Sequence, residues 1–479
     1  MFDQLPTEMY GLKVIATALA ITLPLVATVH IVLTKRNLRA AIGWIGVVWL
    51  APYLGIILYF ILGVNRIRRR ASRLRPEPIH PRAPRRQPRM PRAVGEAAGL
   101  AELVGNMTDL PLLGGNRIVP LINGDDAYPA MLAAIDGAKR SLALSTYIFD
   151  NDAVGRRFVD ALSAAVKRGV EVRVLVDSVG GRYTFPRIFS ALDRADIPMG
   201  EFLHSFIPWR MSYLNLRNHR KILVADGELG FTGGINIRRW HILRDNATAA
   251  SGIQDLHFKI EGPVVEHLMN VFADDWAFTT GEVLSGDIWF PALKREGEVA
   301  ARGITGGPDE DYERLRLVMM AAISEAKRSI VIVTPYFLPD DVLMSALNLK
   351  AMSGVEVDII IPRRGNLRLV QWAAMAQLDQ LISRGCRVWQ TPPPFDHSKL
   401  MLVDDTWTFI GSANWDQRSL FLNFEFNLEC YGAALAADLA TIAEKKRAAA
   451  HLLTLQDLEA RALPIKLRDG IARLFAPYL

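Results

Sequence analysis

The N-terminal part of the chain contains two long runs of apolar residues. Residues 14–33 carry no full charge, although Pro24 and His30 interrupt the run, and residues 40–64 carry no charge at all. Each run exceeds the roughly 18–20 residues that a helix needs to cross the hydrocarbon core of a bilayer. A cleaved signal peptide does not fit, because the first run is too long and a second follows directly. The pattern predicts a transmembrane helical hairpin over residues 1–66.

Beyond residue 100, the pattern of apolar and polar positions occurs twice. The matching pairs are AAIDGAKRSLALSTYIFDND (133–152) with AAISEAKRSIVIVTPYFLPDD (321–341), and GVEVRVLVDSVG (169–180) with GVEVDIIIPRRG (354–365). Each copy alternates helical segments with apolar strands, which is typical of an α/β fold. We therefore expect two repeats, over residues 101–300 and 301–432, joined by a linker near residues 286–311.

Two further segments flank the repeats. Residues 67–100 are rich in proline and arginine, and proline prevents a regular helix. An extended tether on anionic lipid headgroups, or simply the positive flank of a membrane span, is expected there. Residues 433–479 are expected to be helical and end in LPIKLRDGIARLFAPYL. The last helix can pack on the domain or lie at a membrane surface, with Ile465, Leu467, Ile471 and Leu474 on one face.

The distribution of charge argues against a nucleic-acid-binding surface. The net charge is +6, but residues 65–92 alone carry +10, from eleven arginines and one glutamate, which leaves −4 for the rest. A general basic surface is therefore absent from the composition. The positive-inside rule places the bulk of the chain and the N-terminus in the cytoplasm, although Lys35, Arg36 and Arg39 between the apolar runs oppose this orientation.

A histidine, a lysine and an aspartate occur at the same spacing once in each repeat, and an asparagine follows each histidine by seventeen residues. The two sets are His219, Lys221, Asp226 and Asn236, and His397, Lys399, Asp404 and Asn414. On a strand, residues i and i+2 share a face, so each imidazole is expected beside an ammonium group. A single set is weak evidence, but two sets at equivalent places of a repeat indicate a shared chemical role.

These side chains suit an anionic phosphoryl group better than a metal ion. An ammonium group beside each histidine repels a cation, and Cys386 and Cys430 are too far apart to form a zinc motif. Two lysines and two asparagines can bind phosphate oxygens and stabilise developing charge. One histidine can attack phosphorus while the other protonates the leaving alcohol and deprotonates the incoming one. The pattern predicts two-step phosphodiester exchange through a phosphohistidine, with no metal or nucleotide cofactor.

At these residues the chain resembles the phospholipase D superfamily, whose signature is the paired HKD motif, and more narrowly the bacterial cardiolipin synthases. The resemblance extends from the apolar hairpin through NHRK, GGIN, IEGP, TPYFLPDD, DHSK, GSANWDQRS and NFEFNLE to RLFAPYL. It implies an α/β fold of two pseudo-symmetric repeats, each with a mixed sheet flanked by helices, and one active site at their seam. It also implies a multi-pass protein of the bacterial inner membrane.

The resemblance implies a role for each candidate residue. The six HKD residues form the catalytic motif, with His219 and His397 as nucleophile and acid/base, and His219 the more usual nucleophile. The lysines, Asn236 and Asn414 would bind phosphate, and the two aspartates would buttress the motif. An acidic residue further along commonly orients each histidine, and here Glu425 and Asp255 are the candidates. Asp255 follows Asn236 by nineteen residues and Glu425 follows Asn414 by eleven, because of an added segment near 238–252, and IQDLH stands where WRDTH is usual.

Membrane anchoring favours phosphatidyl transfer over hydrolysis, because it raises the local lipid concentration and a dry seam keeps water from the intermediate. We expect transfer between two phosphatidylglycerol molecules, giving cardiolipin and glycerol, with anionic membrane lipids and no nucleic acid as partners. A phospholipase D that hydrolyses, or that transfers to other alcohols, is the alternative. A nuclease is disfavoured by the position of the basic excess, and an inactive scaffold by two complete motifs. A phosphatidylethanolamine donor and a homodimer are left open.

Overall fold

The computed structural model describes residues 7–35, 38–60, 90–202, 216–244, 251–307 and 313–476. It divides into two compact units, Met1–Arg70 and Ala71–Leu479. Residues 67–89 of the expected tether lie outside the described residues. The end of that segment is packed rather than extended, because η2 (Arg92–Ala97) and α5 (Ala98–Gly105) bury Val94 and Leu100 in the core of the second unit.

The described part of the first unit contains three helices where two membrane spans were expected. α1 (Thr7–Thr34) includes Lys13–Thr34, the one stretch among the described residues that is long and apolar enough to cross a membrane. The second apolar run breaks into α2 (Leu38–Leu50) and α3 (Pro52–Leu58). Proline disfavours helical geometry in the residue before it, and Ala51 has φ −136° and ψ 74°. The described residues therefore show one helix long enough to cross a membrane, and they do not show a second continuous span.

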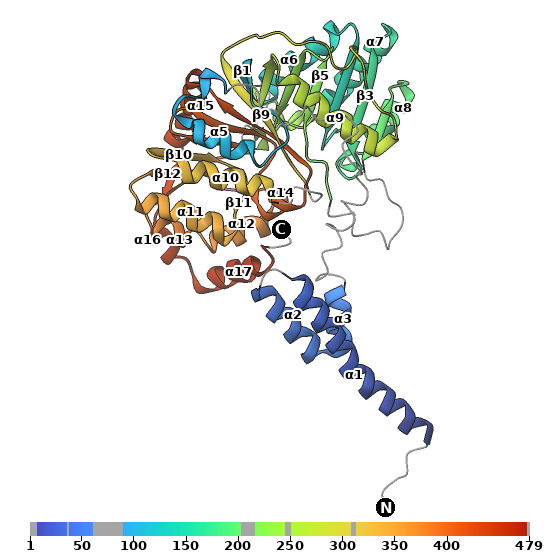
Figure 1. Ribbon diagram of the computed structural model, residues 1–479, viewed down its shortest axis with the longest axis vertical. Coiled ribbons are helices and arrows are strands. Elements are labelled where there is room, and N and C mark those ends of the chain that lie inside the picture. Colours follow the sequence, from blue (N-terminus) through green and yellow to red (C-terminus); the bar gives the residue numbers. More distant parts are fainter. Residues whose placement is uncertain are drawn as a thin grey trace, which may run out of the picture. The chain divides into compact units, whose positions relative to one another are not determined.

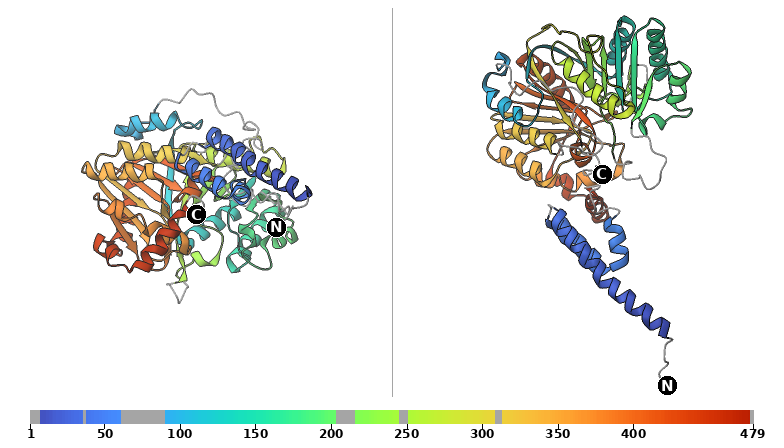
Figure 2. Two further views of the ribbon diagram at one scale, coloured as in Figure 1. Left: turned by 90° about the horizontal axis from the view of Figure 1, so that it is seen from below. Right: turned by 45° about the vertical axis from the view of Figure 1, so that its right-hand side comes forward.

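The chain reverses direction between α2 and α3, so that the two helices lie side by side (Figure 1 and Figure 2, right). A Cβ on Gly55 would lie 2.3 Å from Val47 O, whereas residues eight apart in a straight helix are separated by about 12 Å. The Tyr53 hydroxyl donates to Ala16 O at 2.6 Å. The Tyr59 hydroxyl lies 2.7 Å from His30 Nδ1. α3 therefore returns toward the C-terminal end of α1.

The second unit is built on one mixed sheet of fifteen strands, in the order β19-β13-β12-β10-β15-β16-β18-β9-β1-β8-β6-β5-β2-β3-β4. In chain order these strands are β1 (Leu113–Ile122), β2 (Ser141–Thr146), β3 (Glu171–Asp177), β4 (Met199–Phe202), β5 (Ile222–Ala225), β6 (Leu229–Gly233), β8 (Leu256–Glu261), β9 (Val299–Gly306), β10 (Ser329–Val333), β12 (Glu356–Pro362), β13 (Arg387–Thr391), β15 (Leu400–Val403), β16 (Trp407–Gly411), β18 (Glu425–Tyr431) and β19 (His451–Leu453). Two short pairs lie apart from it: β7 (Ile253–Gln254) with β14 (Phe395–Asp396), and β11 (Phe337–Leu338) with β17 (Trp415–Asp416).

The strand order is the same in both halves once β19, which lies outside β13 at the edge of the second half, is set aside. The first half runs β4-β3-β2-β5-β6-β8-β1, and the second runs β13-β12-β10-β15-β16-β18-β9. The antiparallel pair β1–β9 joins them, so the two sheets that the repeats predicted form one. β9 comes from the stretch near 286–311 that was expected to be a linker. The apolar pattern of this strand is interrupted in the sequence by Arg302. The arginine is nevertheless fully buried, because it pairs with Glu429.

Helices cover both faces of each half of the sheet (Figure 1). They are α6 (Asn123–Gly137), α7 (Ala153–Lys167), α8 (Ile188–Arg194) and α9 (Val265–Thr280) in the first half, with α10 (Arg314–Glu325), α11 (Asp341–Met352), α12 (Arg368–Met375), α13 (Asp379–Ile382), α14 (Gln417–Phe421), α15 (Ala433–Ala448), α16 (Leu455–Glu459) and α17 (Leu463–Leu474) after β9. The short 3-10 turns η3 (Gly180–Arg182) and η5 (Arg239–His241) complete the described elements of the first half. α15 follows β18 as α9 follows β8.

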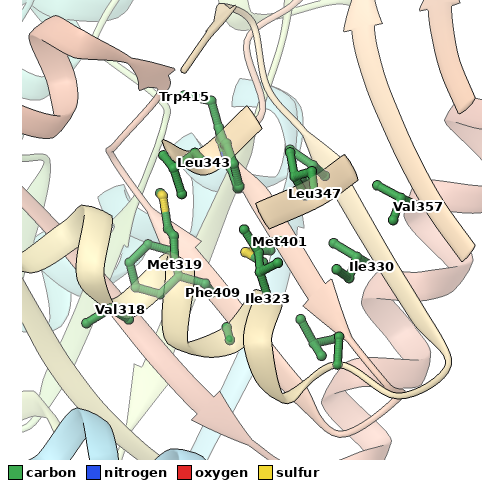
Figure 3. Close-up of a cluster of buried hydrophobic side chains, with 14 of the residues drawn as sticks. Val318, Met319, Ile323, Ile330, Leu343, Leu347, Val357, Met401, Phe409 and Trp415 are labelled. Carbon is green, nitrogen blue, oxygen red and sulfur yellow. The ribbon is translucent and has the colours of Figure 1, made fainter. Parts of the chain in front are cut away.

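The apolar face of the second half packs beneath α10 and α11. Figure 3 shows Met319 and Ile323 of α10 and Leu343 of α11 against Ile330 and Met401 of the sheet. Because side chains alternate along a strand, the same strands direct their other face toward α15. This rigid double layer holds the two motif segments at the middle of the sheet.

Candidate active site

Both histidine–lysine pairs lie directly before a central strand, β5 or β15, rather than within it. Each lysine turns back onto its own histidine. Lys221 Nζ donates to His219 O at 2.7 Å. Lys399 Nζ lies 2.8 Å from His397 Nδ1 and also donates to His397 O. The expected adjacency of imidazole and ammonium is thus present, although an extended loop creates it instead of a strand.

Each imidazole contacts a carboxylate from the other half of the molecule. His219 Nδ1 lies 3.0 Å from Glu425 Oε2, and His397 Nδ1 lies 2.7 Å from Asp255 Oδ2. The backbone makes the same exchange, because His219 N donates to Phe424 O and His397 N donates to Gln254 O. Both carboxylates were predicted from the sequence. Their positions after each motif did not indicate that each one contacts the histidine of the other half.

Each carboxylate is held on its far side as well. Ser412 Oγ donates to Glu425 Oε2 at 2.5 Å, and Asn423 Nδ2 donates to Glu425 Oε1 at 3.1 Å. Gly234 occupies the position equivalent to Ser412 in the first repeat. A Cβ there would lie only 2.1 Å from Asp255 Oδ1, so the second glycine of TGGIN allows this carboxylate to approach.

The two asparagines reach the same end of the strands as the histidines. β5 pairs with β6 in the register Ile222↔Thr232, so Asn236 follows the end of β6 on the side from which His219 leads into β5. β15 pairs with β16 in the register Leu400↔Ile410, so Asn414 follows the end of β16 on the side from which His397 leads into β15. Asn236 Oδ1 accepts a hydrogen bond from Ile148 N at 3.0 Å, so the amide nitrogen of Asn236 points away from Ile148.

The two aspartates of the motif lie at the opposite ends of β5 and β15 from the histidines. Asp226, at a positive φ of 53°, accepts hydrogen bonds from the backbone N–H groups of Lys139, Arg140 and Ser141. Asp404 accepts from Lys327, Arg328 and Ser329 in the same way. They fasten the motif hairpin to the start of β2 or β10. Their contacts are those of buttressing residues, the role that the family resemblance implies, and they lie away from the imidazoles.

Burial and mutual repulsion lower the pKa values of the basic groups. Burial brings the pKa of Lys221 to about 7 and that of Lys399 to about 8, against the opposing effect of nearby carboxylates. Burial likewise lowers the pKa of His219, and it lowers that of His397 well below the ordinary value, with Lys399, Lys221 and His219 adding to the effect. Since groups of one half act on groups of the other, the two motifs form one site.

The pKa values of the two carboxylates are shifted in opposite directions. Burial would raise the pKa of Glu425, but His219, Lys221 and Ser412 bring it below its ordinary value. Burial raises the pKa of Asp255 in spite of Lys399. Glu425 is therefore the stronger anion, which distinguishes the surroundings of the two imidazoles.

Two tyrosines border the site that sequence reasoning did not select. The ring of Tyr147 lies edge-on to His219, with centroids 5.0 Å apart, and that of Tyr336 lies 6.3 Å from His397. Both occur in the first matched segment of the repeat, in TYIFD and PYFLP. Their repetition was the available signal. Burial raises the pKa of both phenols, so they stay neutral beside the imidazoles.

With Nδ1 directed to a carboxylate, each imidazole presents Nε2 for chemistry. Two such nitrogens beside two ammonium groups fit a phosphoryl group between them. Among the described residues, no cluster of three or more histidine, cysteine, aspartate or glutamate side chains is arranged to hold a metal ion.

The two-repeat sheet and its paired histidines define a phospholipase D-like protein. Residues 131–276 and 319–447 match the family model described as "Cardiolipin synthase, PLD-like domain", and residues 22–63 match "Phospholipase_D-nuclease N-terminal". The chain belongs to the cardiolipin synthase family of phospholipase D-like proteins.

Relatives match over nearly the full length. Cardiolipin synthase A of Pseudomonas aeruginosa is 32% identical over 463 residues, covering 95% of this chain and 94% of that protein. The major cardiolipin synthase of Bacillus subtilis is 30% identical over 473 residues, covering 95% and 97%. The crystal structure of a phosphatidylserine synthase from Haemophilus influenzae shares the fold, with a TM-score of 0.61 at 16% identity over 80% of this chain and all of that one.

Proposed function

We propose that this chain is a phosphatidyltransferase that joins two phosphatidylglycerol molecules into cardiolipin and releases glycerol. The observation that carries the proposal is the pair of imidazole–ammonium sets at one seam, in a chain related end to end to cardiolipin synthases. Cardiolipin synthase activity follows from this relationship. The lipid pair, the order of steps and the residue roles are the proposed part.

In the first step, Nε2 of one histidine attacks the phosphorus of phosphatidylglycerol. The bond from phosphorus to the glycerol headgroup oxygen breaks, and the other histidine gives that oxygen a proton. Lys221, Lys399 and the amide nitrogens of Asn236 and Asn414 balance the charge on the equatorial oxygens. The product is a phosphatidyl group bonded to histidine nitrogen, together with free glycerol.

In the second step, a second phosphatidylglycerol enters, and its terminal hydroxyl gives its proton to the histidine that acted as acid. The hydroxyl oxygen attacks phosphorus and the phosphorus–nitrogen bond breaks, which releases cardiolipin. One phosphodiester replaces another, so no external energy source enters the balance. Water at this stage would give phosphatidic acid instead, so the buried site favours transfer.

We assign the nucleophile to His219. Its Nδ1 faces Glu425, whose pKa is below the ordinary value, so the carboxylate is anionic and increases the electron density at Nε2. His397 faces Asp255, whose pKa is raised, and the Lys399 ammonium group. Asp255 is therefore the weaker anion of the two, and the histidine that it contacts is assigned the remaining role of acid and base.

We further propose that the N-terminal unit anchors the enzyme in a bacterial inner membrane, with the catalytic unit in the cytoplasm. α1 supplies the crossing helix. A second crossing would need α2 and α3 to form one span, but the 13 residues of α2 make only about 20 Å of helix against a hydrocarbon core of about 30 Å. The reversal at Ala51 supports a re-entrant pair that enters and leaves the same face.

The proposal is tested with purified full-length protein in phosphatidylglycerol vesicles, with products identified by mass spectrometry. Cardiolipin and glycerol in equal amounts are expected. His219→Ala and His397→Ala should each lower the rate at least about 1,000-fold, whereas His451→Ala, which removes an exposed histidine, should leave it unchanged. Phosphatidic acid as the main product would instead show a hydrolase. Turnover indifferent to both substitutions would refute the paired-histidine mechanism.

A further inference from the structure

The C-terminal helix α17 exposes a continuous apolar stripe. Leu463, Leu467, Ile471 and Leu474 follow each other at helical spacing, and Phe475 borders them. Their exposed fractions lie between 53% and 76%. Side chains separated by three or four residues share one helix face, so these five residues form one surface, called the α17 face below.

The orientation of this helix is fixed by its opposite side. Asp469 is 1% exposed and forms ion pairs with Arg461 and, at 2.8 Å, with Arg468. The Arg468 guanidinium lies 4.3 Å from the ring centroid of Trp372 in α12, and Ala472 is buried against α12. The α17 face is therefore held outward by polar and apolar contacts, rather than exposed by fraying of the chain end.

Basic residues border the α17 face on both sides. A helix advances by 100° per residue, which places Lys466 and Arg473 along one edge of the stripe and Arg468 along the other. Asp469 is the one acidic residue of the helix, and it is buried and paired. An apolar stripe between cationic edges is the pattern of a helix that lies in an anionic bilayer surface.

α12, against which α17 packs, also borders a pocket next to the active site. This pocket is lined by Leu367, Val370, Ala374 and Met375 of the α12 segment and by Tyr336. The Tyr336 ring neighbours His397. α12 thus packs against α17 and also lines a mainly apolar pocket that is bordered by Tyr336, a neighbour of His397.

We propose that the α17 face binds the surface of an anionic lipid bilayer, with its apolar residues among the acyl chains and its basic edges at the headgroups. This inference rests on the proposed function, because that function makes the substrate a lipid of the bilayer. It would hold the catalytic unit against the membrane at a second point, separate from α1, with the α12 pocket near the lipid supply. A second copy of this chain or the apolar N-terminal helices would compete for the same face.

The test uses full-length protein carrying His397→Ala, so that the lipid is not consumed, with an environment-sensitive fluorophore on a single introduced cysteine. Cys386 and Cys430 are buried and react slowly with the label. Ile471→Cys reports on the α17 face, and Leu349→Cys, an exposed leucine of α11, is the matched control. The protein is reconstituted in vesicles of phosphatidylcholine with or without phosphatidylglycerol, and nitroxide-labelled lipid serves as quencher.

In phosphatidylglycerol vesicles, the label at position 471 should shift to shorter wavelength and lose about half or more of its emission to the quencher, while the label at 349 stays aqueous. Lys466→Glu with Arg473→Glu should remove the effect. An aqueous signal at 471 would overturn the proposal. A blue-shifted signal that the lipid quencher does not reach would also overturn it, in favour of a protein contact. Neither readout depends on turnover, so absence of cardiolipin synthesis leaves this test intact.

Discussion

The surroundings of the two histidines differ at the level of single atoms, and this difference predicts their division of labour. A substrate whose headgroup is p-nitrophenol needs no proton to leave, so it makes the acid unnecessary in the first step. With this substrate, His397→Ala should release a burst of about one nitrophenolate per enzyme and then stop at the phosphohistidine. His219→Ala should release none. Stopped-flow absorbance measures the burst, and a burst in His219→Ala alone would reverse the assignment.

The lowered pKa values of the basic groups predict an unusual pH dependence. The lowered pKa of His219 keeps the nucleophile neutral, so the acidic limb of kcat/KM should lie below the ordinary histidine pKa of about 6.5. Lys221 and Lys399, with pKa values of about 7 and 8, lose charge as the pH rises through that range. Phosphate binding then weakens, so KM should rise above neutrality.

Comparing kcat with kcat/KM across the same pH range provides a control for this prediction. A bound phosphodiester favours the charged lysines, so the basic limb should appear at higher pH in kcat than in kcat/KM. Lys221→Arg carries a guanidinium that stays charged, and its basic limb should move to higher pH. A KM that is constant from about pH 6 to 9 would contradict the proposed phosphate-binding role of the lysines.

How far the sequence predicts the site also becomes clear at the residue scale. The histidines, lysines and asparagines could be predicted because the repeat preserves their spacing, and strand register converts spacing into position. The buttressing role of Asp226 and Asp404 came only from the family resemblance. Tyr147 and Tyr336 were missed because an aromatic residue after a buried strand is read as core. The role of Asp255 depends on Gly234, whose missing side chain has no signal in a hydrophobic pattern.

At the scale of the elements, the reversal between α2 and α3 leads to a prediction about membrane topology. If α1 alone crosses the bilayer, the start of α2 and the catalytic unit lie on one face and the N-terminus on the other. We expect Leu38→Cys and Leu349→Cys to react with a membrane-impermeant maleimide only after spheroplasts are lysed, and Asp3→Cys to react before lysis. The buried native cysteines give a low background.

Two crossings would give the opposite pattern for the α2 position. Leu38→Cys would then react in intact spheroplasts, while Asp3→Cys and Leu349→Cys would be protected together. The re-entrant arrangement also removes a conflict in the sequence. Lys35 before α2, Arg39 at the start of α2, and the arginines after residue 65 are then expected on the same face, as the positive-inside rule requires. Hydropathy could not reveal this, because Ala51 and Pro52 are uncharged and the break depends on backbone geometry.

At the scale of the whole second unit, the two repeats share one continuous sheet and one candidate active site. Sequence repetition predicted the equivalence of the halves, but the β1–β9 pair and the crossed carboxylates are contacts between distant segments, which repeat spacing does not encode. Since Glu425 belongs to the second half and orients the first histidine, neither half holds a complete nucleophile. The duplication therefore supplies each histidine and also the group that orients it.

The crossed arrangement predicts which carboxylate serves the first chemical step. In the His397→Ala background with the p-nitrophenyl substrate, Glu425→Gln should slow the burst about 100-fold or more, because the amide no longer holds the nucleophile in the required tautomer. Asp255→Asn should leave the burst unchanged, since its partner histidine is already absent. With the natural lipid and both histidines present, either substitution should lower turnover. If each carboxylate instead served its own half, Asp255→Asn would slow the burst and Glu425→Gln would not.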